Sequence, residues 1–133
     1  MKKLMALITL IATMTTFQIG AHENHDHGAP TIQAPKGGIL KATHNANFEL
    51  VKSGQLVKIY VYDQKGQNLS TTQFKVEAEL EIPRKKTTKI QLKDLTTHWE
   101  SPVDHQGSHR FTVKLKIVDA KGKDDVQFNI ENK

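Results

Sequence analysis

The clearest structural signal in this chain is the stretch Phe74-Lys75-Val76-Glu77-Ala78-Glu79-Leu80-Glu81-Ile82, in which apolar and charged side chains alternate. Alternation with a period of two places one face of a β-strand in a core and the other face in water, and no helix satisfies this period. The same alternation recurs over residues 110–117 and again over residues 126–130. These three segments therefore predict strands with one buried face.

Shorter apolar segments between these strands are bounded by turn-forming residues such as Ser53-Gly54 and Asp119-Ala120-Lys121-Gly122. The segments predict further strands at 38–43, 47–52, 55–63, 86–92 and 98–101. Seven or eight strands without any helical period are typical of an immunoglobulin-like antiparallel β-sandwich, and this all-β class is the fold we expect. The chain contains no cysteine. The inter-sheet disulfide of antibody domains is therefore excluded.

The N-terminus has the three parts of a secretory signal peptide. Basic Lys2 and Lys3 precede an apolar run over residues 4–12, and small residues follow at Gly20 and Ala21. We expect cleavage after Ala21; an uncleaved N-terminal anchor is the alternative. The expected organisation is a signal peptide at 1–21, a flexible His-rich tail at 22–35 and a β-sandwich domain at 36–133. This predicts a periplasmic or secreted protein with no membrane span after cleavage.

The composition limits the partners and the chemistry. The chain has 133 residues and a net charge of +5, of which Lys2 and Lys3 supply two charges. The other lysines alternate with apolar residues along the predicted strands, so we expect no nucleic-acid partner. All three methionines lie in the expected signal peptide. A mature chain without Cys or Met can bind a metal only through imidazole and oxygen ligands.

Three of the seven histidines, His22, His25 and His27, lie close together at the start of the expected mature chain. Imidazole is a preferred ligand for Cu(II) and Zn(II), and Glu23 and Asp26 add oxygen donors. We therefore predict a Cu(II) or Zn(II) site in this tail. The alternative is a polar spacer that only follows a signal peptide.

A second group of histidines consists of His98, His105 and His109. If residues 98–109 formed a hairpin, His98 and His109 would face each other across two antiparallel strands and could share a metal with His105. The alternative is that all three are exposed loop and strand-edge histidines. His44, beside Asn45 and Asn47, is expected to be a turn residue, and a ligand role is the alternative.

We expect no enzymatic activity. The chain has no Gly-x-Ser-x-Gly elbow, phosphate-binding glycine loop or His-Glu-x-x-His helix. Ser101, Ser108 and Asp104, near His105, contain hydrolase-type groups, but a short loop on so small a domain offers little shelter from water. A copper oxidase built on a His22 chelate would need a second histidine held rigidly beside it.

Part of the chain resembles a known domain. Pro35-Lys36-Gly37-Gly38, then Glu49-Leu50-Val51 and Tyr60-Val61-Tyr62-Asp63, resemble a small periplasmic β-domain that accompanies heavy-metal efflux adaptors of the RND type. The resemblance covers residues 34–82 and continues beyond them only as a strand pattern. Lys36 occupies a position at which several relatives have His or Asn. The lipoyl-like and long hairpin segments of a full adaptor are absent, which implies a free-standing domain.

These observations predict a periplasmic protein that binds copper or zinc and either buffers the metal or delivers it. Its expected partners are the metal ion and an efflux adaptor or another envelope protein. The alternative function is a metal-independent protein-interaction domain of the cell envelope, which would bind its partner through edge strands or a side-chain patch.

Overall fold

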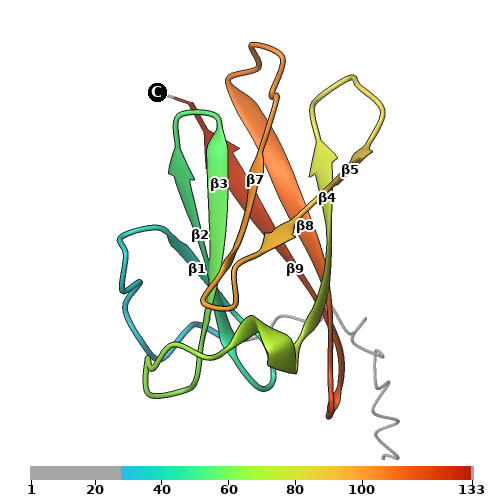
Figure 1. The fold of residues 1–133 in the computed structure, drawn as a ribbon. Helices are drawn as coiled ribbons and strands as arrows, with labels where there is room; N and C mark the ends of the chain where they lie inside the picture. The colour runs from blue at the N-terminus through green and yellow to red at the C-terminus, as the bar shows by residue number, and fades with distance from the viewer. Residues whose placement is uncertain (1–27, 133) are drawn as a thin grey trace, which may run out of the picture.

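The computed structural model describes residues 28–132, which form nine β-strands and one turn of 3-10 helix (Figure 1). In chain order these elements are β1 (Ile39–Ala42), β2 (Asn47–Ser53), β3 (Leu56–Tyr62), η1 (Thr71–Gln73), β4 (Lys75–Glu81), β5 (Thr88–Ile90), β6 (Lys93–Asp94), β7 (Trp99–Pro102), β8 (Arg110–Asp119) and β9 (Gly122–Glu131). The predicted all-β class is confirmed. No helix within residues 28–132 has the length and apolar character needed to cross a membrane.

The strands form two antiparallel sheets. The five-stranded sheet has the order β1-β2-β3-β7-β6, and the four-stranded sheet has the order β5-β4-β8-β9. Two long hairpins, β2–β3 and β8–β9, provide most of the local pairing, and β4 joins the second hairpin along its full length. The two sheets lie face to face with the strands running between two ends of the domain (Figure 1).

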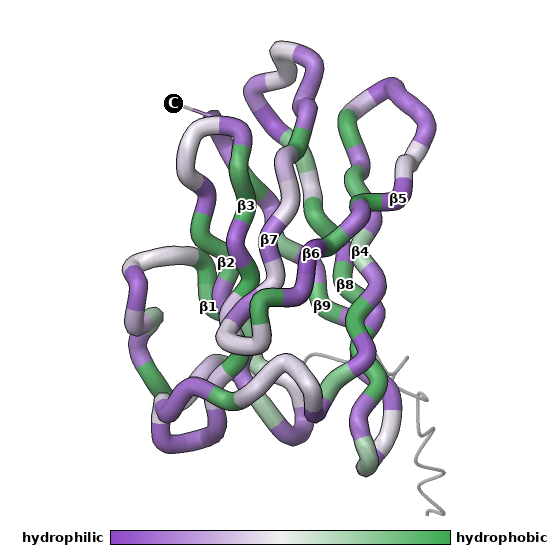
Figure 2. The backbone as a smooth tube through the Cα atoms, in the orientation of Figure 1, coloured by the Kyte–Doolittle hydropathy of each residue, from purple (hydrophilic) through white to green (hydrophobic). Residues whose placement is uncertain are grey.

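The core lies between the two sheets and follows the alternation in the sequence. The four-stranded sheet contributes Ala78, Leu80, Ile82, Phe111, Val113, Leu115, Ile117, Val126, Phe128 and Ile130, and the five-stranded sheet contributes Phe48, Leu50, Val57, Ile59, Val61 and Trp99. Figure 2 shows the alternation as green and purple bands along the strands. The indole of Trp99 is buried and stacks on Phe48 with ring centroids 6.4 Å apart. Burial of these apolar side chains is the main source of stability for the two-sheet domain.

One predicted strand is wrong in its extent. Residues 86–92 were expected to form a single strand, but the chain forms β5 in the four-stranded sheet and then β6 in the five-stranded sheet. The chain therefore crosses from one sheet to the other between Ile90 and Lys93. Ile90 and Leu92 stay partly buried against the core during this crossing. Neither Gly nor Pro marks the crossing, so the sequence pattern does not reveal it.

Candidate metal-binding histidines

The three expected tail ligands precede the described residues, and the structure therefore does not place them: they are His22, His25 and His27. The described chain begins beside the two-sheet domain. Residues 28–30 line an open groove together with residues 40–42 of β1 and residues 125–127 of β9. The tail is thus joined to the domain at the edge where β1 and β9 approach each other.

The expected hairpin between His98 and His109 does not form. β7, which follows His98, pairs with β3 and β6, whereas β8, which follows His109, pairs with β4 and β9. These strands belong to different sheets. The four residues of β7, about 13 Å of extended chain, separate His98 from the loop that carries His105 and His109. The prediction that His98 and His109 face each other across a hairpin is wrong, because a sequence pattern does not determine which strands pair.

His98 lies against the outer face of the five-stranded sheet. Its ring stacks on Tyr60 with centroids 4.7 Å apart, and its Nδ1 lies 2.8 Å from the Thr97 hydroxyl. The Nε2 atom is buried and lies 3.5 Å from Glu100 Oε2, without hydrogen-bond geometry. This ring is held by aromatic packing.

His105 and His109 lie in the loop between β7 and β8, near the end of β9. The ring of His105 stacks almost parallel on Phe111, at 5.6 Å between centroids and an interplanar angle of 3°. The exposed His109 accepts a hydrogen bond through its backbone oxygen from the Asn132 N–H at 2.7 Å. The side-chain amide of Asn132 also donates to the Ser108 carbonyl at 2.8 Å. Asn132 therefore fastens this loop to the end of β9.

No three His, Asp or Glu side chains between residues 28 and 132 lie close enough together to hold a metal ion. The histidines of the described domain can therefore contribute single ligands or pairs.

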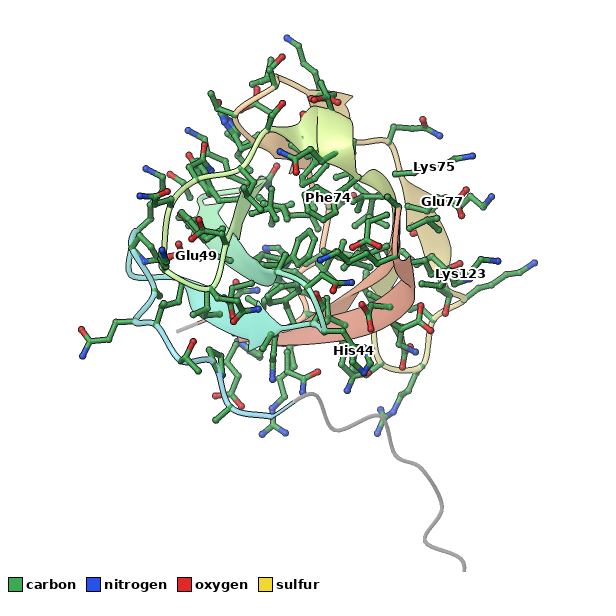
Figure 3. All side chains as sticks on the ribbon, turned by 90° about the horizontal axis from the view of Figure 1, so that it is seen from below. His44, Glu49, Phe74, Lys75, Glu77 and Lys123 are labelled. Atoms are coloured by element: carbon green, nitrogen blue, oxygen red, sulfur yellow. The ribbon has the colours of Figure 1, made fainter. Side chains whose placement is uncertain are left out.

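A buried carboxylate in β2 has no signal in the sequence pattern. Glu49 is fully buried, although its place in an alternating strand predicts exposure on the outer face of the sheet. Its Oε1 accepts hydrogen bonds from the backbone N–H of Lys36 at 3.0 Å and of Gly38 at 2.7 Å. Its Oε2 accepts one from the Tyr62 hydroxyl at 2.8 Å and lies 3.2 Å from the Lys36 nitrogen. Loop 34–38 thus folds over the carboxylate and covers it (Figure 3).

Two further contacts complete this cover, and the whole arrangement is called the Glu49 network below. Gly38 has no room for a side chain, since an added Cβ would lie 2.3 Å from the Leu50 carbonyl oxygen. The Lys36 ammonium lies 4.7 Å from the centroid of the Tyr60 ring, which is a cation–π distance. Burial, followed by the hydrogen bond to Glu49 and its negative charge, raises the pKa of Tyr62 well above its ordinary value.

A second carboxylate, Asp124, lies beside the turn between β1 and β2. His44 Nδ1 lies 2.8 Å from Asp124 Oδ1, and Asp124 belongs to β9. The neighbouring Asn45 amide donates to Asp119 Oδ2 at 3.2 Å. The turn is therefore bound to the β8–β9 hairpin by two side-chain contacts. His44 is a turn residue, as expected, but the contact with Asp124 joins residues 80 positions apart and has no signal in the sequence.

The outer face of the four-stranded sheet carries alternating charges that pair across strands. Lys116 Nζ lies 3.3 Å from Glu79 Oε1, and Lys114 pairs with Glu81. The hydrogen bond to Glu81 and its negative charge raise the pKa of Lys114. These are solvated ion pairs, and they form no enclosed site.

Compared with protein-family models, curated protein sequences and solved structures, the chain gives no match.

Proposed function

We propose that this chain is a periplasmic protein that binds a divalent transition metal, Cu(II) or Zn(II), through His22, His25 and His27, and that it buffers or delivers the metal. The observation that carries this proposal is the position of these three histidines. They immediately precede a domain in which residues 28–132 contain no complete set of metal ligands of their own.

The two-sheet domain would be the carrier of this tail. We propose an immunoglobulin-like sandwich related to the β-domain of heavy-metal efflux adaptors. Supporting this, residues from all three segments that carry the resemblance contact one another in the Glu49 network: Lys36 and Gly38, Glu49, and Tyr60 and Tyr62. Their joint presence in the sequence then has a structural cause, because each completes the burial of the same carboxylate.

Capture by the tail follows from its composition. A segment without large apolar residues has little to bury, so metal binding has to order it, and the lost chain entropy limits the affinity. The acceptor for delivery would be an efflux adaptor or another envelope protein. Moderate affinity suits such transfer, since the metal has to be released.

The direct test is calorimetric titration of Cu(II) and Zn(II) into the secreted protein and into its H22A/H25A/H27A variant. We expect the variant to lose more than about 100-fold in affinity, because loss of ligands exceeds the 10–100-fold effect of outer-shell partners. The matched control is H105A/H109A, which removes two histidines from the opposite end of the domain and should bind as the parent does. Equal binding by the tail variant and the parent would contradict the proposal.

A pH series adds an independent check. Ligating imidazoles must be neutral, and an unperturbed histidine side chain takes up a proton at a pH of roughly 6.5. Binding by the parent should therefore weaken as the pH falls from 7.5 to 5. Unchanged binding at pH 5 would count against histidine ligation.

One observation favours the alternative of a metal-independent interaction domain. β9 is a strand of ten residues at the edge of the four-stranded sheet, and edge strands can bind an extended partner segment. A protein that binds neither metal in the titrations above would leave this alternative as the better explanation.

A further inference from the structure

We propose that β9 is a self-association surface. Two copies of this chain would pair their β9 strands antiparallel about a two-fold axis at Gln127 and so join their four-stranded sheets into one continuous sheet. This inference goes beyond the proposed function, because its partner is a second copy of the chain and no metal takes part.

The first argument is the length of the free edge. β9 has ten residues and, within residues 28–132, pairs with β8 alone. The other strands at sheet edges, β1, β5 and β6, have four, three and two residues. A long edge presents a row of unpaired N–H and C=O groups, and folded proteins usually shorten or cover such an edge. β9 is therefore the strand best able to bind another strand.

The second argument is which residues direct their backbone groups to this edge. The Asn132 N–H donates to the His109 carbonyl at 2.7 Å, in the same register as the β8–β9 pairs. Hydrogen bonding alternates along an antiparallel pair, so the even-numbered residues of β9 direct their backbone groups to β8. The odd-numbered residues direct theirs to the free edge, and their side chains are all exposed: Lys123, Asp125, Gln127, Asn129 and Glu131.

The start of the described chain lies beside this edge without pairing with it. Residues 28–30 line an open groove together with residues 40–42 and 125–127. Within residues 28–132, no backbone hydrogen bond joins this segment to β9. In the described part of the chain, the edge is thus open to a second strand.

The third argument is that the exposed side chains of β9 are complementary to themselves. In an antiparallel pair centred on Gln127, Lys123 of one copy lies opposite Glu131 of the other. The two-fold axis makes this ion pair occur twice. All the odd-numbered residues of β9 then face a partner, which gives about ten backbone hydrogen bonds between the copies.

The same register also pairs Asp125 with Asn129 of the second copy. The side-chain oxygen of Asn129 accepts a hydrogen bond from the Thr112 hydroxyl at 3.0 Å. The NH2 group of this amide can therefore donate to the Asp125 carboxylate opposite it. Every polar side chain along the edge has a partner of suitable chemistry in this register.

The fourth argument is that other registers of the same strand are less favourable. One places Asp125 opposite Asp125 of the second copy, and another places it opposite Glu131. Like charges directly opposite each other destabilise a strand pair. A register centred on Val126 avoids this repulsion, but it pairs fewer residues and loses the ion pairs of Lys123. The charges therefore favour the register centred on Gln127.

The experiment is sedimentation equilibrium of the full chain over a range of concentrations. EDTA is present, so that a metal shared between two copies cannot hold them together. We expect a monomer that converts to a dimer as the concentration rises. A chain that stays monomeric at every concentration would overturn the inference.

Charge reversal tests the register. Lys123→Glu and Glu131→Lys each place like charges opposite each other twice, so each should weaken dimerisation about 10-fold. The double variant K123E/E131K restores opposite charges and should dimerise within about threefold of the parent. Lys89→Glu is the matched control, because it makes the same change of charge on β5, at the opposite edge of the sheet. It should leave dimerisation unchanged. Equal weakening by the single and double variants would contradict this register.

A proline substitution tests whether the edge itself forms the interface. Gln127→Pro removes an N–H that faces the edge and leaves the pairing with β8 intact, so it should abolish the dimer. A dimer that persists in Gln127→Pro would overturn the inference. Should this variant fail to fold, as judged by near-ultraviolet circular dichroism, the charge-reversal and cysteine variants decide the question.

Introduced cysteines locate the two-fold axis. Gln127→Cys places two thiols opposite each other, with Cα atoms about 5.5 Å apart, and should form an intermolecular disulfide on air oxidation. Asn129→Cys is the control, because its two copies lie about 14 Å apart along the strands and cannot be bridged. The chain has no other cysteine, so any disulfide joins the introduced residues. Equal crosslinking of both variants would overturn the inference. None of these results depends on the tail histidines, so the proposed function is tested separately.

Discussion

Two carboxylates of this domain are nearly inaccessible to water, and their partners give them different roles. Glu49 accepts hydrogen bonds from the backbone of Lys36 and Gly38 and from the Tyr62 hydroxyl, all within the domain. Asp124 instead binds the ring of His44, which is mostly exposed. Glu49 fixes a loop to the sheet, whereas Asp124 fixes the orientation of a surface imidazole.

The difference shows that two nearly buried carboxylates can have partners of different kinds. A buried carboxylate is costly unless donors satisfy it, and both side chains meet this condition. What differs is the kind of donor. Glu49 is bound by backbone N–H groups and a tyrosine hydroxyl, whereas Asp124 is bound by an imidazole that is mostly exposed at the surface.

The largest effect is expected at Glu49. Glu49→Gln keeps one oxygen for the Lys36 and Gly38 N–H groups but replaces Oε2 by an NH2 group, which cannot accept from the Tyr62 hydroxyl and lies against the Lys36 N–H. It also removes the negative charge that strengthens these hydrogen bonds. We expect a loss of about 3 kcal/mol in the free energy of unfolding, measured by urea denaturation. A loss below about 1 kcal/mol would show that loop 34–38 is not held by this carboxylate.

A smaller effect with a pH signature is expected at Tyr62. Tyr62→Phe removes one donor to Glu49 and should cost about 1–2 kcal/mol at neutral pH. Because its pKa is raised in the folded state, Tyr62 keeps its proton at a pH where the unfolded chain loses it. Its contribution to stability is thus complete below about pH 10 and is lost as the pH rises further.

The test compares the stability of the parent with that of Tyr62→Phe as the pH rises. The parent should lose stability more steeply than Tyr62→Phe between pH 9.5 and pH 11, as followed by thermal unfolding. Parallel curves would show that the proton on Tyr62 is not coupled to folding.

The smallest effect is expected on the outer face of the four-stranded sheet. Lys116→Ala removes a solvated ion pair with Glu79 and should change the free energy of unfolding by less than about 1 kcal/mol. This variant is the reference for Glu49→Gln, since both changes remove a charge from a strand. A cost as large as that of Glu49→Gln would contradict the claim that burial and hydrogen bonding set the difference.

The sequence predicts the parts of this fold that depend on local periodicity. β4, β8 and β9 follow from alternation, because burial of one face imposes a period of two on the side chains. The change of sheet between β5 and β6 could not be predicted, since residues 88–94 carry no Gly or Pro. Strand pairing depends on contacts distant in sequence, so the expected hairpin of His98 and His109 was wrong.

The same reason limits what sequence reveals about the candidate site. The tail histidines stand out because they are close together in the chain. His44 does not stand out, because Asp124 lies 80 residues away and only the fold brings them together. Glu49 occupies an outward-facing position in the alternating pattern of β2. The pattern does not indicate that its carboxylate is buried, because two of its donors belong to a loop 11 to 13 residues earlier.

The most direct test of the central claim is to record the nitrogen shifts of all seven imidazole rings by NMR during titration of the protein with Zn(II). The tail site predicts that the resonances of His22, His25 and His27 change, while those of His98, His105 and His109 stay constant. Changes confined to the second group, or none at all, would contradict the account.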